Sequence, residues 1–173
     1  ANAGVSKGAP LLQATAEEFD WQFSVNVRGV WATGKAFIEK MLSAEQFGHL
    51  TITASEHSIG LQHTGAGFYT GTKHAILGMA DVWREELPDS IGISTFCPGL
   101  VATQLFDAGR FGVGGEMPEP VKAIGAAIMA RGMQPADVAR AAIDGTERGD
   151  FLIMTHPAAL AAAEKRFREI EQA

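Results

Sequence analysis

The sequence predicts an α/β fold in which a parallel sheet lies between two layers of helices. Short, apolar, β-branched runs alternate along the chain with longer segments that have helical periodicity, and this alternation is typical of parallel sheets. The 173 residues suffice for one domain with a substantial core, and no internal repeat or second domain is visible. We therefore expect residues 1–173 to form a single domain.

The N-terminal half predicts two long helices with a strand between them. Thr15-Ala16-Glu17-Glu18 is a capping box, and apolar residues then recur at three- and four-residue steps, so a helix is expected over about 16–42. The short apolar run at 49–54 predicts a buried strand. A second helix is expected from about Gly65 to Leu87, where Pro88 ends it.

The C-terminal half continues the alternation. Residues 91–97 predict another strand, and the glycine-rich stretch 100–133 is expected to hold short helices. A helix is expected over 134–148, with a proline near its first position. A last strand over 151–155 and a terminal helix over 157–170 complete the prediction.

Composition and charge narrow the classes of partner. The formal net charge is −6 and no basic run offsets it, which argues against nucleic acid. No apolar stretch approaches the roughly 20 residues that a membrane span needs. The single cysteine, Cys97, excludes an internal disulfide and favours a reducing, cytoplasmic location. The five histidines have no metal-ligand spacing, so no metal site is expected.

Tyr69 and Lys73 are the most informative pair in the sequence. They lie four residues apart in a predicted helix, so their side chains project from one face about one turn apart. An ammonium beside a phenol favours the phenolate, so we expect Lys73 to lower the Tyr69 pKa toward the range of a general acid/base. The pair therefore indicates proton transfer at an alcohol or carbonyl carbon.

Five motifs, in order, resemble those of the classical short-chain dehydrogenase/reductase family over nearly the whole chain. They are Asn2-Ala3-Gly4, Ser24-Val25-Asn26-Val27, Ile52-Thr53-Ala54-Ser55, Tyr69-x-x-x-Lys73 and Pro98-Gly99-Leu100-Val101-Ala102-Thr103. The resemblance implies a Rossmann-like three-layer α/β/α fold. It also implies an oxidoreductase that transfers hydride between NAD or NADP and a small alcohol/carbonyl substrate.

The resemblance assigns four catalytic residues. Tyr69 is the general acid/base, and Lys73 tunes it and hydrogen-bonds the nicotinamide ribose. Ser55 anchors the substrate oxygen, and Asn26 supports a water in a proton relay. Ser55 lies fourteen residues before Tyr69, where the family commonly has thirteen, so Ser58 at eleven is a competitor. His57 and His63 are loop histidines beside this site and are candidate substrate contacts.

The resemblance also assigns cofactor contacts at two places. Asn2, Ala3 and Gly4 would line the adenine-ribose side, where the absence of a Cβ at Gly4 permits close approach of the backbone. The second group passes beneath the nicotinamide, and Tyr69 and Lys73 complete the set. This second group comprises Pro98, Gly99, Val101 and Thr103.

One family feature is missing from the sequence. The glycine-rich turn that cradles the cofactor pyrophosphate at a helix N-terminus does not occur. We therefore expect the chain to be the C-terminal half of the fold, with about three strands, an unpaired edge on the 49–54 strand and weak cofactor binding when isolated. Residues 104–133 would form a substrate lid. The family often associates through its long helices, so a homo-oligomer is expected, with Phe37, Met41 and Trp83 as candidate contacts.

Two alternative functions stay open on the sequence. An epimerase or dehydratase of the same fold would share the Tyr/Lys pair, although such enzymes usually carry a larger C-terminal substrate domain. A non-catalytic scaffold or sensor would need none of Ser55, Tyr69 and Lys73. Their joint presence favours an enzyme.

Overall fold

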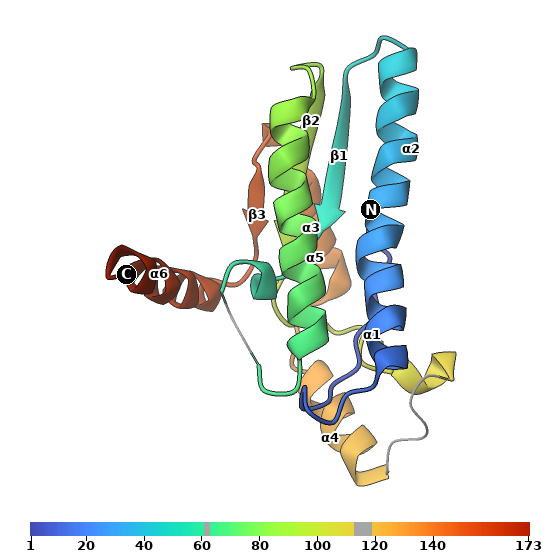
Figure 1. The fold of residues 1–173 in the computed structure, drawn as a ribbon, viewed down its shortest axis with the longest axis vertical. Helices are drawn as coiled ribbons and strands as arrows, with labels where there is room; N and C mark the ends of the chain where they lie inside the picture. Colours follow the sequence, from blue (N-terminus) through green and yellow to red (C-terminus); the bar gives the residue numbers. More distant parts are fainter. Residues whose placement is uncertain (61–62, 113–118) are drawn as a thin grey trace.

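Three parallel strands form one sheet in the computed structural model, which describes residues 1–60, 63–112 and 119–173 (Figure 1). Their order is β1 (Gly48–Thr53), β2 (Ile91–Cys97), β3 (Leu152–Met154). β1 pairs with β2 along its whole length, and β3 pairs with the end of β2 from Thr95 onward. The predicted parallel α/β architecture is confirmed; the ends of β2 match the prediction, and those of β1 and β3 differ from it by one residue.

Helices cover both faces of this sheet. Figure 1 shows α2 (Gly29–Ser43) and α3 (Gly67–Glu86) in front of the strands and α5 (Pro135–Arg148) behind them. On the front face, α2 contacts β1 and α3 contacts β2, whereas α5 contacts β2 and β3. This arrangement gives the three layers that alternating strands and helices predict.

The first long helix differs from the prediction in one detail. It is a continuous helical run, but α1 (Ala16–Phe23) and α2 are joined by a π-helical segment over Ser24–Arg28. In this segment the Gly29 N–H donates to the Ser24 carbonyl, five residues back. The wider turn holds Asn26, whose side chain is fully buried.

The main core lies between β1, β2 and the two front helices. Its fully buried members include Ile52 and Ile76, and burial of one such side chain contributes about 1.5–3 kcal/mol. The two helices approach closely where Trp83 packs over Gly34, since a Cβ at Gly34 would lie 2.4 Å from the Trp83 ring. Gly34 therefore allows the front layer to close on itself.

The expectation that the outer edge of β1 is unpaired is partly wrong. The first residue lies along this edge, where the Ala1 amino group donates to the Thr51 carbonyl (2.7 Å). The Thr53 N–H in turn donates to the Ala1 carbonyl (2.9 Å). Ala1 therefore makes strand-like hydrogen bonds with β1 and occupies part of the edge that we expected to be open.

The remaining elements lie at the ends of the sheet. Short 3-10 helices at Glu56–Ser58 and Ala108–Phe111 precede α3 and α4 (Glu119–Met129). Helix α6 (Ala158–Glu171) projects from the body, as Figure 1 shows, and Arg166 on it hydrogen-bonds His74 of α3 (2.7 Å). Among the described helices, none has the length and apolarity needed to cross a bilayer.

Candidate active site

The N-terminal segment is attached to the first helical run through side-chain amides. Asn26 accepts a hydrogen bond from the Val5 N–H (2.8 Å) and donates to the Val5 carbonyl (2.8 Å). Its second N–H donates to the Thr72 hydroxyl of α3 (3.1 Å). Both side-chain N–H groups of Asn26 are thus occupied. The proton relay expected at this residue would therefore have to use the side-chain oxygen of Asn26.

Asn26 therefore holds three elements together. It joins the Ala1–Val5 segment, the π-helical segment and α3, and it carries Val5 into a buried position. One turn earlier, Gln22 makes the same pair of bonds with Lys7, but at 3.4 and 3.5 Å. The placement of Asn26 inside the site agrees with the prediction, and its first observable task is structural.

Tyr69 and Lys73 lie one turn apart on α3 and both side chains are buried, at 6% and 4% exposure. The Lys73 ammonium lies over the Tyr69 ring, 5.5 Å from its centroid. Lys73 donates a hydrogen bond to the Thr53 carbonyl at the end of β1 (2.8 Å). The predicted pair is therefore brought together at the carboxyl end of the sheet, where α/β proteins place their ligand sites.

The expected direction of the Tyr69 pKa shift is wrong for this structure. Burial raises the pKa of Tyr69 to about 12, opposed by a hydrogen bond with the Ser55 side chain and reinforced by the negative charge of Glu56. Burial also lowers the pKa of Lys73 to about 8. Desolvation disfavours both charged forms and outweighs the attraction that we expected between ammonium and phenolate. Tyr69 is thus a phenol at neutral pH.

The two candidate serines have different partners. Ser55 lies at the end of β1 and its side chain hydrogen-bonds Tyr69. Ser58 lies one turn on, and its hydroxyl donates to the backbone carbonyl of Lys73 (2.8 Å). Only Ser55 is brought to the tyrosine hydroxyl.

His57 forms one wall of the Tyr69 environment. Its ring meets the Tyr69 ring edge-on, with centroids 5.2 Å apart, and its Nδ1 hydrogen-bonds the Thr70 hydroxyl (2.7 Å). The exposed His63 lies 5.0 Å from the His57 ring centroid. Burial, together with the positive charges of His63, His74 and Lys73, lowers the pKa of His57 to about 4. His57 is therefore neutral over most of the acidic range.

The low pKa of His57 predicts a pH-dependent stability. Between pH 6.5 and 4 the unfolded chain binds a proton at His57 that the folded chain does not, so stability falls as the pH falls. His57→Asn keeps a polar atom near Thr70 and removes this titration. We expect the free energy of unfolding of the wild type to fall by at most about 3 kcal/mol more than that of the variant over this window. Urea unfolding at pH 7.5 and pH 4 measures it, and equal losses would contradict the assignment.

The predicted cofactor residues at the N-terminus lie beside Lys73. Asn2 accepts a hydrogen bond from the Thr53 hydroxyl (2.9 Å), and Ala3 is exposed. Gly4 passes so close that a Cβ on it would lie 3.8 Å from the Lys73 nitrogen and 3.6 Å from the Asn26 oxygen. This segment therefore adjoins the catalytic candidates and is not a frayed end.

The Pro98–Thr103 segment follows the end of β2. The Pro98 carbonyl accepts a hydrogen bond from the Glu56 N–H (3.0 Å), and the Gly99 N–H donates to Nδ1 of His156 (3.0 Å). Val101 pairs with Met133 and packs with the smaller core cluster. Thr103 is exposed, and its hydroxyl accepts a weak hydrogen bond from the Leu105 N–H (3.4 Å).

Sequence reasoning missed two residues of this region, Glu56 and His156. Both side chains lie against Gly99, since a Cβ there would lie 2.7 Å from a Glu56 oxygen and 2.4 Å from the His156 ring. The negative charge of Glu56 acts on Tyr69. The only sequence signal for Glu56 is its position directly after Ser55, and His156 lies 57 residues from Gly99 and gives none.

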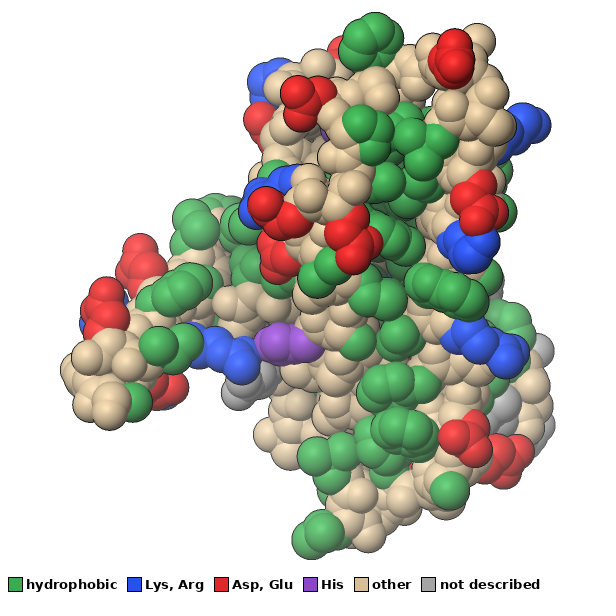
Figure 2. All heavy atoms as spheres, turned by 45° about the horizontal axis from the view of Figure 1, so that its top comes forward, with side chains coloured by type: hydrophobic (Ala, Val, Ile, Leu, Met, Phe, Trp, Pro, Cys, Tyr) green, Lys and Arg blue, Asp and Glu red, His purple; other side chains and the backbone are tan. Residues whose placement is uncertain are grey.

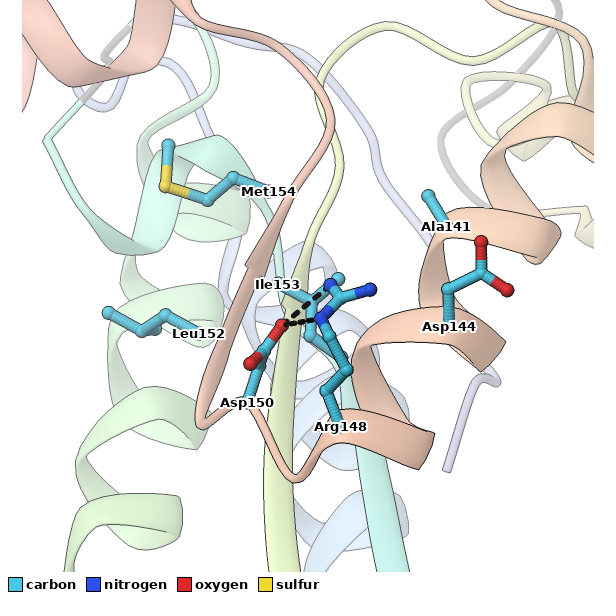
Figure 3. Close-up of a pocket in the computed structure, with 7 residues that line it drawn as sticks. All are labelled: Ala141, Asp144, Arg148, Asp150, Leu152, Ile153 and Met154. Carbon is cyan, nitrogen blue, oxygen red and sulfur yellow. Dashed lines mark hydrogen bonds and ion pairs between the residues drawn. The ribbon is translucent and has the colours of Figure 1, made fainter.

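A cavity elsewhere has no part in this site. It measures about 360 Å³ and lies between α5 and β3, lined by Ala141, Asp144, Arg148, Asp150, Leu152, Ile153 and Met154 (Figure 3). The Arg148–Asp150 ion pair spans it at 2.6 Å. None of these residues belongs to the predicted site. Within the described ranges, no group of three or more His, Cys, Asp or Glu side chains is arranged to hold a metal ion.

A comparison of the sequence with known protein families identifies the family of this chain. Residues 1–110 match the sequence profile described as short chain dehydrogenase. The chain belongs to the short-chain dehydrogenase family. The chain is 27% identical to the C alpha-dehydrogenase of Sphingobium sp. strain SYK-6, over 97% of the chain and 57% of that protein.

Solved structures of the family agree with the fold. A short-chain dehydrogenase/reductase from Burkholderia phymatum, in complex with NAD, superposes with a TM-score of 0.86 at 29% identity and covers 99% of this chain. LigO from Sphingobium sp. strain SYK-6 superposes at 0.76 with 30% identity and covers 98% of the chain. The chain spans 65% and 56% of these two proteins. It therefore corresponds to somewhat more than half of a family member.

The residues present fit one half of a dinucleotide cofactor. Lys73 has three N–H groups, and within the described part of the chain one of them bonds to Thr53. The Lys73 nitrogen lies close to the Gly4 backbone, 3.8 Å from where a Cβ on Gly4 would lie.

Proposed function

We propose that the whole protein interconverts an alcohol and a ketone or aldehyde, with Tyr69 as general acid/base and NAD or NADP as cofactor. The observation that carries the proposal is the convergence of Ser55, Tyr69 and Lys73 at the end of β1. The Ser55 hydroxyl bonds to Tyr69, and the Lys73 amine lies over the Tyr69 ring. These groups come from two elements, so their meeting is a property of the fold.

Each residue has one task in this proposal. Ser55 donates a hydrogen bond to the substrate oxygen and holds it beside Tyr69. Tyr69 gives its proton to that oxygen in reduction and takes one in oxidation, and with its pKa above the ordinary value it carries that proton at neutral pH. Lys73, fixed by Thr53, presents its other N–H groups to the ribose. The cofactor, when bound, supplies or accepts the hydride.

The two serines provide a matched test. Ser55→Ala removes the donor for the substrate oxygen, so we expect kcat to fall by about 10²-fold. Ser58→Ala removes only the bond to the Lys73 carbonyl, so we expect kcat to change little and the free energy of unfolding to drop by about 1 kcal/mol. Steady-state kinetics and thermal unfolding of both variants measure this. The reverse pattern would make Ser58 the catalytic serine.

We also propose that the segment 104–133 forms a lid over the substrate, within a single domain. Both ends of this segment are attached at one point: the Ala102 N–H donates to Met133 and the Met133 N–H donates to Leu100, each at 3.0 Å. Residues 113–118 of the proposed lid lie outside the described residues. A cytoplasmic location is proposed as well, supported by the free thiol of Cys97.

A homo-oligomer through the two front helices is proposed from their surface. Figure 2 shows apolar side chains gathered along one face of the molecule, and a groove of about 380 Å³ runs between α2 and α3. Trp31 and Val82, which line this groove, are exposed at 47% and 53%, and Phe37 of α2 is exposed at 58%.

A charge introduced on this face by substitution tests whether the protein forms the proposed oligomer. We expect Val82→Lys to halve or quarter the mass of the wild-type assembly, because an ammonium would be buried in a self-complementary contact. Light scattering after gel filtration measures the mass. Glu147→Lys on α5 is the matched change on the opposite layer and should leave the mass unchanged. A monomeric wild type, or an unaltered Val82→Lys assembly, would contradict the proposal.

A further inference from the structure

The short connection between β3 and α6 contacts the backbone that follows β2. His156 lies in this connection, and its Nδ1 accepts a hydrogen bond from the Gly99 N–H (3.0 Å), 57 residues away. The ring lies so close to Gly99 that a Cβ there would be 2.4 Å from it. His156 thus joins the end of β3 to the segment 98–103.

This hydrogen bond determines which nitrogen of the His156 ring carries the proton. A backbone N–H can only donate, so Nδ1 presents its lone pair to Gly99 and the ring proton is on Nε2. The Thr155 hydroxyl lies 2.7 Å from the same Nδ1 and therefore donates to it as well. Only the neutral ring, protonated at Nε2, accepts both hydrogen bonds.

The segment 98–103 begins beside the candidate catalytic serine. The N–H of Glu56, the residue after Ser55, donates to the Pro98 carbonyl (3.0 Å). The backbone of Ser55 also hydrogen-bonds the thiol of Cys97. The start of the segment is therefore attached to the end of β1 on one side and, through Gly99, to the end of β3 on the other.

Two amides of this segment have no acceptor in the part of the chain that the structure describes. They are the N–H groups of Leu100 and Val101, which lie between Gly99 and the hydrogen bond from the Ala102 N–H to the Met133 carbonyl (3.0 Å). Because the backbone is attached on both sides of these two donors, their directions are set before a ligand binds. Donors of this kind suit a carboxamide oxygen, the polar group of nicotinamide.

We propose that His156 is a positioning residue for the nicotinamide cofactor: its Nδ1 fixes Gly99, and thereby aims the Leu100 and Val101 amides at the carboxamide. The inference rests on the proposed function and on the expected contact between segment 98–103 and the nicotinamide. His156 acts through Gly99 and has no part in the chemical step. The position requires an uncharged hydrogen-bond acceptor, because a second ring proton would occupy the lone pair that Gly99 uses.

Two variants of the whole protein separate the acceptor from the rest of the ring. His156→Leu removes the acceptor and leaves the Gly99 N–H without a partner, so we expect the Kd of the reduced cofactor to rise about tenfold. His156→Asn places a side-chain oxygen near the position of Nδ1 and should restore most of that affinity. Titration of nicotinamide fluorescence with NADH and with NADPH measures both.

His49 provides the matched control. It also bonds across two strands through a ring nitrogen, since its Nε2 hydrogen-bonds the Ser94 hydroxyl (2.7 Å), but it lies at the opposite end of β1 from Ser55. His49→Leu should lower the melting temperature and leave the Kd of the cofactor unchanged. This control distinguishes a loss of positioning at Gly99 from a general loss of stability.

Hydrogen exchange at the Gly99 N–H measures the contact without any cofactor. Exchange should be faster in His156→Leu than in the wild type, and His156→Asn should reverse the change. Equal exchange in the two variants, an unchanged Kd in His156→Leu, or an equal loss of affinity in both variants would overturn this inference alone. Failure of the wild type to bind NADH or NADPH would instead contradict the proposed function, and the inference would fall with it.

Discussion

Replacing Tyr69 by Phe in the whole protein should lower kcat by about 10²–10⁴-fold, the usual contribution of a positioned general acid/base. The change removes one hydroxyl and leaves the ring that packs against His57 and Lys73. With the pKa of Tyr69 raised to about 12, the wild-type side chain carries its proton at neutral pH, and both directions of the reaction pass through the same proton transfer, so both should slow. Steady-state kinetics in both directions measures the effect.

Folding must be controlled in the same experiment. The Tyr69 hydroxyl hydrogen-bonds the Ser55 side chain, so its removal should cost about 1 kcal/mol of folding stability. The melting temperature of Tyr69→Phe should therefore stay within a few degrees of that of the wild type. A folded variant with lost turnover supports the enzyme. A folded variant that keeps its full function would reject the acid/base role and favour the non-catalytic scaffold that the sequence leaves open.

Replacing Asn26 by Leu should destabilise the protein by about 3 kcal/mol or more, because it leaves buried backbone groups without partners. Asn26 makes three hydrogen bonds, two to Val5 and one to Thr72. Leucine has nearly the same shape and can make none of them. Urea unfolding measures the loss, and hydrogen exchange at the Val5 N–H should show release of the N-terminal segment.

Gln22 provides the matched control for Asn26. It makes the same two-bond contact with Lys7, but at 3.4 and 3.5 Å where those of Asn26 to Val5 are 2.8 Å. Gln22→Met should therefore have less than half the effect of Asn26→Leu. Equal losses of stability in the two variants would show that Asn26 acts only as a buried polar residue of the helix. Its hydrogen bonds to Val5 would then contribute no more than those of Gln22 to Lys7.

Much of the fold follows from local patterns. The capping box at Thr15 is present with both of its hydrogen bonds, and α3 ends at Glu86, two residues before Pro88. Helices and strands were predicted to within about two residues because alternation, apolar periodicity and proline act over a few residues. The spacing of Tyr69 and Lys73 predicted their meeting for the same reason, since one helical turn separates them.

Other features depend on contacts between distant segments. A π-helical turn stands around Asn26 where an α-helix was expected, and a side-chain contact with Val5, 21 residues away, holds Asn26 inside. The Tyr69 pKa moves in the direction opposite to our expectation because the amount of burial outweighs the nearby ammonium. Neither burial nor a partner 21 residues away is visible in a local pattern.

The sequence by itself determined the class of fold, the family resemblance and the identity of Ser55, Tyr69 and Lys73 as candidates, because each rests on residue types and spacings that are read directly along the chain. Only the tertiary structure gave Ser55 and Ser58 different partners, raised the pKa of Tyr69 by burial, and brought Glu56 and His156 together over Gly99. These outcomes depend on how the carboxyl ends of β1, β2 and β3 meet at one edge of the sheet. Exclusion of solvent at that edge shifts the pKa values of Tyr69 and Lys73. This exclusion does not depend on how far apart the contributing residues lie in the sequence.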